Sequence, residues 1–255
     1  MKAPTPALPR SVFFRTGEGP GVGAKRHTQT MPGLIALIGG YEFRANCREM
    51  DRALLARVGT SARVLVAPTA AAFESPRQAA NNGVQHLKRL GARPEALNVL
   101  NHSDADSDNY AAMVDKAQGV YFTGGDPVHL LETLRGSKVW SAVVSLCERG
   151  GLIAGSSAGA MAFGGKMWVP GEGWRDGLGL VPRVAVVPHH ATVSHRWDAP
   201  QMAATLPPNV TLLGVDEATA LLLPDHLVLG EGEVTVYTPE PMAYAPGSIV
   251  SQKLD

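Results

Sequence analysis

The stretch LIAGSSAGAMAFGG, residues 152–165, carries the strongest structural signal in the chain. It begins with an apolar run typical of a buried strand and continues with small residues in a short helical pattern. Between the two, Gly155 and Gly159 flank Ser157 in the pattern G-x-S-x-G. Glycines at these positions permit a sharp bend from strand to helix that a Cβ atom would obstruct. The stretch therefore predicts a strand–turn–helix unit with Ser157 at its tip.

Apolar runs and helical patterns alternate on the N-terminal side of this unit. The predicted strands are 34–38, 63–70, 96–100, 119–125 and 152–155, and the predicted helices are 47–58, 78–90, 109–117, 126–135 and 138–149. This alternation favours βαβ units in an α/β fold, with a mostly parallel sheet flanked by helices. After residue 205, short β-type runs separated by Pro, Gly and Asp predict antiparallel strands at an edge of the sheet.

Length and composition predict a single globular domain. The 255 residues, 45% of them hydrophobic, suffice for one sizeable core. Residues 1–31 are rich in Pro, Gly and basic side chains, so we expect a disordered N-terminal extension followed by one α/β domain over 32–255. Met31 lies just before the first apolar run, and we keep it as a hypothesis that translation begins there.

Charge and cysteine content argue against several classes of partner. Lys plus Arg and Asp plus Glu both number 23, so the formal charge of zero favours neither nucleic acid nor an anionic membrane. No apolar run reaches the about 18 residues that a membrane span needs. Cys47 and Cys147 fit neither a metal motif nor a disulfide framework. We therefore expect a cytoplasmic protein without cofactor or metal, with a homodimer as the oligomeric state to test.

Ser157 and His189 are the candidate nucleophile and base. Ser157 would lie at a helix N-terminus, whose free N–H groups favour a developing oxyanion, while Ser156 would point away. A serine needs a base to take its proton, and His189 ends an apolar strand-like run on the same carboxyl edge of the sheet. The alternatives are a small-residue turn that only lets a helix pack closely, and a solvated surface turn holding His189 and His190.

An orienting acid and a second oxyanion donor complete this hypothesis. Glu172 and Asp176 are the two acids between the serine and the histidine, and either could orient the imidazole. The strand-end turn YFTGGD, residues 121–126, could supply a backbone N–H with no side chain in the way. Gly125 is the first choice for this donor, and Gly124 is the next.

Four motifs, in this order, resemble the cyanophycinase and aspartyl dipeptidase (peptidase E) family of serine peptidases: YFTGGD, AGSSAGAMAFGG, GLGLVPRVAVVPHH and GVDEATALLL. The resemblance implies a flavodoxin-like, three-layer fold similar to the class I glutamine amidotransferases, with serine replacing their cysteine. It implies Ser157 as nucleophile, His189 as base, and an oxyanion hole formed by the N–H groups of Gly125 and Ala158. In the dipeptidase branch the acid follows the serine by fifteen residues, which favours Glu172 over Asp176 here.

The resemblance also implies an acidic substrate, since substrates of the family present an aspartyl carboxylate that calls for a cation. Pro127 replaces a substrate-holding glutamine of the cyanophycinases, and Val193 replaces an arginine. We therefore expect a small acidic peptide or isopeptide other than cyanophycin. The expected substrate contacts are Gly124, Asp126, His190 and Arg196, with Arg175, His195 and Lys166 as further cations.

Asp216 and Glu217, in the motif GVDEATAL, are expected to bond nearby loops rather than to act in catalysis. Two other functions fit parts of the sequence. A non-catalytic or regulatory binding module on the same fold would account for Pro127 and Val193, and the G-x-S-x-G turn alone also fits an α/β-hydrolase-type esterase. Against the esterase, His189 follows Ser157 by only 32 residues, and nearly the whole sheet precedes the nucleophile.

Overall fold

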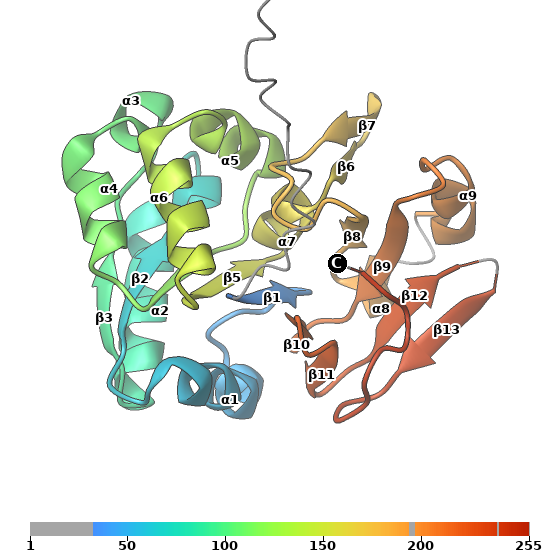
Figure 1. The fold of residues 1–255 in the computed structure, drawn as a ribbon, viewed down its shortest axis with the longest axis horizontal. Coiled ribbons are helices and arrows are strands. Elements are labelled where there is room, and N and C mark those ends of the chain that lie inside the picture. The colour runs from blue at the N-terminus through green and yellow to red at the C-terminus, as the bar shows by residue number, and fades with distance from the viewer. Residues whose placement is uncertain (1–32, 194–196, 239, 255) are drawn as a thin grey trace, which may run out of the picture.

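A seven-stranded sheet forms the centre of the computed structural model, which describes residues 33–193, 197–238 and 240–254. Its strands are β1 (Leu34–Ile38), β2 (Arg63–Ala67), β3 (Arg93–Ala96), β4 (Gly119–Phe122), β5 (Leu152–Ser156), β10 (Thr219–Leu223) and β11 (Leu227–Gly230). They lie in the order β11-β10-β1-β5-β4-β2-β3 (Figure 1). The five strands from β1 to β3 in this order are parallel, whereas β10 and β11 are antiparallel additions at one edge.

The register of this sheet gathers three strand ends at one edge. Ile38 at the end of β1 lies opposite Ser156 at the end of β5, and Phe122 at the end of β4 lies opposite Gly155. The segments that follow these strands therefore emerge side by side. In parallel α/β sheets this carboxyl edge is where ligands bind.

Helices cover both faces of the sheet, as the sequence predicts (Figure 1). They are α1 (Arg48–Val58), α2 (Pro76–Arg89), α3 (His102–Ala105), α4 (Asp108–Asp115), α5 (Pro127–Leu134), α6 (Lys138–Glu148), α7 (Ala158–Phe163), α8 (His190–Val193) and α9 (Ala199–Ala204), with 3-10 turns at Ala45–Cys47 and Thr69–Ala71. Alternate strand residues face two separate cores. Side chains of α1 and α2 join one core with Ile38 and Val66, and those of α4 to α7 join the other with Leu37 and Phe122.

A second, four-stranded sheet lies beside the first one, in the order β13-β12-β9-β8 (Figure 1). It consists of β8 (Val184–Val187), β9 (Thr211–Val215), β12 (Val234–Tyr237) and β13 (Pro241–Tyr244). A separate hairpin pairs β6 (Lys166–Val169) with β7 (Gly173–Asp176). The predicted antiparallel edge strands are thus confirmed for β10 and β11, whereas β9 and β12 belong to this second sheet.

Three predicted strands differ clearly from the structure in their boundaries. The strand predicted at 119–125 ends at Phe122, and Gly124 and Gly125 belong to the turn that follows it. The strand predicted at 96–100 is wrong in position, because β3 covers Arg93–Ala96. Beyond β3, the Leu97 N–H still donates to the carbonyl of Val66 in β2. The strand predicted at 63–70 ends at Ala67, and a 3-10 turn begins at Thr69. The expected N-terminal extension, residues 1–31, lies outside the described residues.

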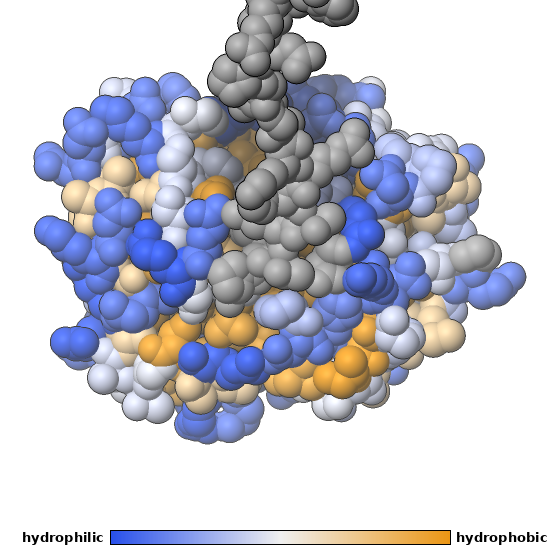
Figure 2. All heavy atoms as spheres, in the orientation of Figure 1, coloured by the Kyte–Doolittle hydropathy of each residue, from blue (hydrophilic) through white to orange (hydrophobic). Residues whose placement is uncertain are grey.

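The surface on the face shown in Figure 2 is mostly polar over the outer helices, with an apolar area around β11. Among the described residues, Phe73, Met242 and Ile249 are large apolar side chains with more than half of their area exposed. No helix within the described ranges is long and apolar enough to cross a membrane. Nothing in the structure shows what covers the apolar area, so the homodimer stays a prediction.

Candidate active site

The strand–turn–helix unit at Ser157 has the predicted shape. Ser157 joins β5 to α7 with φ 48° and ψ −103°, a strained combination for a residue that carries a side chain. A Cβ on Gly155 would lie 2.7 Å from the Gly159 carbonyl carbon, and one on Gly159 would lie 3.3 Å from Phe122 Cβ. The two glycines are therefore needed because α7 packs directly against the strands that precede it.

Ser157, His189 and Glu217 form a hydrogen-bonded chain. Ser157 Oγ lies 3.1 Å from His189 Nε2, and His189 Nδ1 lies 3.3 Å from Glu217 Oε1. An ionised carboxylate only accepts hydrogen bonds, so Nδ1 carries the ring hydrogen and Nε2 is free to accept the serine proton. The Thr192 hydroxyl donates to the same Glu217 oxygen over 2.6 Å. The arrangement matches a nucleophile, a base and an orienting acid.

The backbone around His189 fixes the position of the imidazole. His189 follows β8 with φ 51°, and its N–H donates to the Gly39 carbonyl over 2.7 Å. A Cβ on Gly40 would lie 2.2 Å from the ring, so only glycine lets the imidazole lie against the chain after β1. The Tyr41 ring and the same imidazole are in edge-to-face contact, with 5.8 Å between the ring centroids.

The structure corrects the choice of acid. Glu172 lies in the turn between β6 and β7, where its side chain is 60% exposed and faces Arg175 at 3.7 Å. Asp176 pairs with Lys166 at 2.6 Å, and this lysine lowers the pKa of the Asp176 carboxyl. Both acids thus form ion pairs with cations of the same β6–β7 hairpin, and neither is the carboxylate beside His189.

Glu217 takes that position instead, contrary to the loop-bonding role expected from the sequence. It lies in the short connection from β9 to β10, which crosses from the second sheet to the first. Its side chain is only 11% exposed. The signal that could have found it is an acid two residues after the end of a buried strand, the same spacing at which His189 follows β8.

The two-glycine turn after β4 lies beside the nucleophile. A Cβ on Gly124 would lie 3.3 Å from Ser157 Cβ. Gly125 has φ +140°, and a Cβ there would lie 2.2 Å from the Ala70 carbonyl oxygen. The Gly124 N–H donates to Glu42, while no hydrogen bond within the described part of the chain engages the Gly125 N–H. No hydrogen bond among the described residues engages the N–H of Ala158, the first residue of α7, so Gly125 and Ala158 are the candidate oxyanion donors.

Asp126, an expected substrate contact, and Pro127, which replaces a glutamine of the cyanophycinases, both have structural roles here. Asp126 caps α5, since its Oδ1 accepts from the N–H groups of Val128 and His129 at 2.8 and 3.1 Å. Pro127 is the first residue of α5, a position where proline costs no hydrogen bond and its fixed φ suits the helix. The residue that lacks the family's glutamine side chain therefore serves as a helix start.

His190 faces the second sheet and does not line the cavity at Ser157. Its Nε2 lies 2.7 Å from the Tyr237 hydroxyl, and its Nδ1 lies 3.4 Å from Asp216 Oδ1. Burial raises the pKa of Asp216, but His190 and the N–H groups of Glu233 and Ala191 outweigh it, so the net pKa is lowered. Of the other expected cations, His195 and Arg196 lie outside the described residues, and Lys166 and Arg175 line a separate hollow beside β7.

A polar cavity of about 610 Å3 opens at Ser157 and His189. It is lined by the glycine turn, the segment after β1 and one face of α2: Tyr41, Glu42, Phe43, Arg44, Asn82, Gln85, Arg89, Gly124, Gly125, Ser157 and His189. Arg44 and Arg89 are its two cations, and sequence reasoning missed both. Asn82, Gln85 and Arg89 follow a helical spacing of three and four, so they share the face of α2 that borders the cavity.

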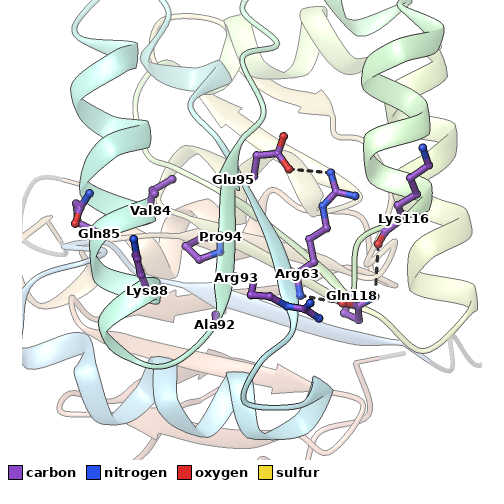
Figure 3. Close-up of a pocket in the computed structure, with 10 residues that line it drawn as sticks. All are labelled: Arg63, Val84, Gln85, Lys88, Ala92, Arg93, Pro94, Glu95, Lys116 and Gln118. Carbon is purple, nitrogen blue, oxygen red and sulfur yellow. Dashed lines mark hydrogen bonds and ion pairs between the residues drawn. The ribbon is translucent and has the colours of Figure 1, made fainter.

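A second hollow, of about 530 Å3, lies at the opposite, amino ends of the strands (Figure 3). Its lining includes the basic residues Arg63, Lys88, Arg93 and Lys116, and Arg63 is held by Glu95 at 2.8 Å. No serine, cysteine or histidine lines this hollow, so it offers no nucleophile–base pair. No cluster of three or more metal-ligating side chains occurs within the described ranges.

The fold and this site define an α/β protein with a serine–histidine–glutamate arrangement at the carboxyl edge of a mostly parallel sheet. The sequence profile of peptidase family S51 matches residues 34–229, and the chain belongs to this family. Family membership and sheet topology together set aside the α/β-hydrolase alternative.

Individual relatives agree with this assignment. Cyanophycinases of Trichormus variabilis and of a Nostoc species are each 28% identical over 145 residues, which cover 56% of this chain and 48% of theirs. The aligned part is thus about half the length of these relatives. A peptidase from an acI-B1 actinobacterium has a similar structure, with a TM-score of 0.79, 29% identity, and coverage of 88% of this chain and 98% of that one. A candidate peptidase E protein from Listeria monocytogenes EGD-e shares the fold, with a TM-score of 0.56, 16% identity, and coverage of 84% of this chain and 98% of its own.

Proposed function

We propose that the protein is a serine-type peptidase that hydrolyses small aspartyl peptides or isopeptides through an acyl-enzyme. The observation that carries this proposal is the chain of contacts from Ser157 through His189 to Glu217, beside a glycine turn in which no hydrogen bond among the described residues engages the Gly125 N–H. These are the parts that acyl transfer by a serine requires: nucleophile, base, orienting acid and oxyanion donors.

The reaction proceeds in two halves. Ser157 Oγ attacks the scissile carbonyl carbon while His189 Nε2 takes the hydroxyl proton, and the carbonyl oxygen becomes an oxyanion that accepts from the N–H groups of Gly125 and Ala158. His189 then gives this proton to the amine as the C–N bond breaks, which leaves an ester on Ser157. Water attacks this ester with His189 again as base, and the returning proton restores the serine. Glu217 remains ionised and stabilises the imidazolium of both halves.

An acidic substrate suits the charges in the cavity. Arg44 and Arg89 line it, and neither forms an ion pair with a carboxylate within the described part of the chain. The one carboxylate among the lining residues, Glu42, is already engaged by two donors. A guanidinium binds a carboxylate with two parallel hydrogen bonds, so these arginines are suited to the aspartyl group of a substrate.

Cyanophycin itself is a poor match for this cavity. Pro127 offers no side-chain amide and begins α5, and Val193 offers no charge. The positions that correspond to two substrate contacts of the cyanophycinases are therefore empty of polar groups. A smaller acidic peptide, recognised from the side of Arg44 and Arg89, needs neither contact.

Incubation with a dipeptide panel tests the proposal. The panel pairs Asp, isoaspartyl, Asn and Ala at the first position with a common second residue, and wild type is compared with Ser157→Ala. We expect turnover of the aspartyl or isoaspartyl members by wild type and none by the variant. Equal turnover by both proteins would refute the nucleophile, and no turnover of any member by wild type would favour the non-catalytic binding module.

A further inference from the structure

The carboxylate of Glu42 joins the ends of three neighbouring strands at the active site. Glu42 follows β1, and its Oε1 accepts from the N–H of Gly124, after β4, over 2.8 Å. Its Oε2 accepts from the hydroxyl of Ser156, the last residue of β5, over 2.7 Å. In the sheet order β5 lies between β1 and β4, so one side chain spans all three strand ends.

We propose that Glu42 is a positioning residue that holds the oxyanion turn beside Ser157. This inference rests on the proposed peptidase function, because it assigns the turn to the oxyanion. With its N–H bonded to Glu42, Gly124 is not the oxyanion donor, and the orientation of its peptide group is fixed. The next N–H, that of Gly125, is the one left to face the nucleophile.

A second contact clamps the turn from the other side. The Asp126 N–H donates to the Ala70 carbonyl over 2.7 Å, and a Cβ on Gly125 would lie 2.2 Å from that same oxygen. Glu42 and Ala70 therefore hold residues 124 and 126 on either side of the Gly125 donor. Oxyanion donors act only within a narrow range of distance, so a turn fixed at both ends keeps the donor in place before substrate arrives.

Ser156 gains a role from this arrangement. Its side chain is fully buried, and its hydroxyl donates to Glu42. The two adjacent serines thus have different roles. Ser157 lines the cavity, and Ser156 donates a hydrogen bond to Glu42, which in turn binds the Gly124 N–H. Alanine at 156 would leave one Glu42 oxygen without this donor.

Glutamine at position 42 separates hydrogen bonding from charge. Its amide oxygen can accept from the Gly124 N–H, and its NH2 group can donate to Ser156 Oγ, so Glu42→Gln can keep both contacts without a charge. Glu42 also lines the cavity, so the competing role is a direct contact with substrate. A substrate contact would affect KM first, whereas a positioning role affects kcat and the reactivity of Ser157.

The main experiment measures the rate constant for phosphonylation of Ser157 by a fluorophosphonate, with kcat and KM on a cleaved dipeptide. We expect Glu42→Ala to lower the phosphonylation rate and kcat by about 10- to 100-fold, since loss of one oxyanion donor costs about 10²- to 10³-fold. Ser156→Ala should fall between wild type and Glu42→Ala. Glu42→Gln should stay within about threefold of wild type, because it can keep the hydrogen bonds. Glu49→Ala, which removes an exposed carboxylate on α1, is the matched control, and thermal melting confirms that each variant folds.

Hydrogen exchange of a peptide that contains Gly124 tests the Glu42 brace, that is, the hydrogen bonds of Glu42 to Gly124 and Ser156. This measurement does not rely on the nucleophile. We expect the Gly124 amide to exchange faster in Glu42→Ala than in wild type or Glu42→Gln. Wild type that resists the fluorophosphonate while these exchange rates differ as expected would refute the proposed function but not the brace. Unchanged exchange and wild-type phosphonylation in Glu42→Ala would overturn the brace, as would a loss in Glu42→Gln as large as in Glu42→Ala, or an effect confined to KM.

Discussion

His189 Nδ1 lies 3.3 Å from Glu217 Oε1, and this contact joins the two sheets of the protein at the active site. Ser157 comes from the seven-stranded sheet, His189 follows a strand of the four-stranded sheet, and Glu217 lies in the connection between the two. The three side chains therefore align only when the second sheet is in place against the first.

The first prediction follows from this contact. Glu217→Gln should lower kcat by about 10²- to 10⁴-fold with a small change in KM, because the imidazole loses both its orientation and the charge that stabilises the imidazolium. Glu172→Gln is the matched control and should stay within about twofold of wild type, since a surface carboxylate outside the site carries little energy. Steady-state kinetics on the same dipeptide checks both. A large loss of kcat in Glu172→Gln with no loss in Glu217→Gln would show that Glu172 is the orienting acid, as the sequence alone suggests.

The second prediction concerns the selection of an acidic substrate. Arg44→Ala and Arg89→Ala should each lower kcat/KM for aspartyl peptides by about tenfold or more, since a hydrogen bond to a charged group contributes about 1.5–3 kcal/mol. Turnover of the asparaginyl counterpart should change less, so the preference for Asp over Asn should narrow. Arg52→Ala, on α1 beside Glu49, is the control for loss of a surface cation. An unchanged preference in both arginine variants would place acid recognition elsewhere.

Much of the fold and part of the site follow from local sequence patterns. The parallel strands, the bend at Ser157 and the position of His189 each depend on a short run of residues. The roles of Glu42 and Arg89 do not, because these residues reach the site through the segment after β1 and the face of α2, and the role of Glu217 depends in addition on the packing of the second sheet. Glu172 shows why spacing along the chain does not identify the acid. It follows the serine by fifteen residues, but it lies in the turn of the β6–β7 hairpin and not beside His189.

The third prediction uses the two cysteines to distinguish serine from thiol chemistry. Burial raises the pKa of Cys47 to about 12 and that of Cys147 to about 11. Both therefore remain protonated thiols at pH 8, and a thiol is a far weaker nucleophile than a thiolate. Iodoacetamide at pH 8 should leave the folded protein unmodified and active, and should modify both residues in guanidinium. Inactivation of the folded protein by iodoacetamide would contradict the proposed chemistry.

The fourth prediction concerns the contribution of a buried pair between α1 and α2 to the free energy of unfolding. Asp51 Oδ2 lies 2.8 Å from His86 Nε2 and ties α1 to α2, and burial raises the pKa of this carboxyl while His86 partly offsets the rise. Asp51→Ala should lower the free energy of unfolding by about 2–3 kcal/mol, because it leaves His86 buried without its partner. Glu49→Ala, which removes an exposed pair on the same helix, should change it by less than about 1 kcal/mol. Urea unfolding of both variants measures the difference, and equal effects would show that the buried pair adds nothing.

The most direct test of the central claim is to map the residue that a fluorophosphonate modifies. Wild type is treated with the probe and digested, and the peptide that contains Ser156 and Ser157 is sequenced by mass spectrometry. The account predicts one adduct per chain on Ser157 Oγ, no adduct on Ser156, and none in Ser157→Ala or His189→Ala. An adduct on another residue, or equal labelling of wild type and Ser157→Ala, would contradict it.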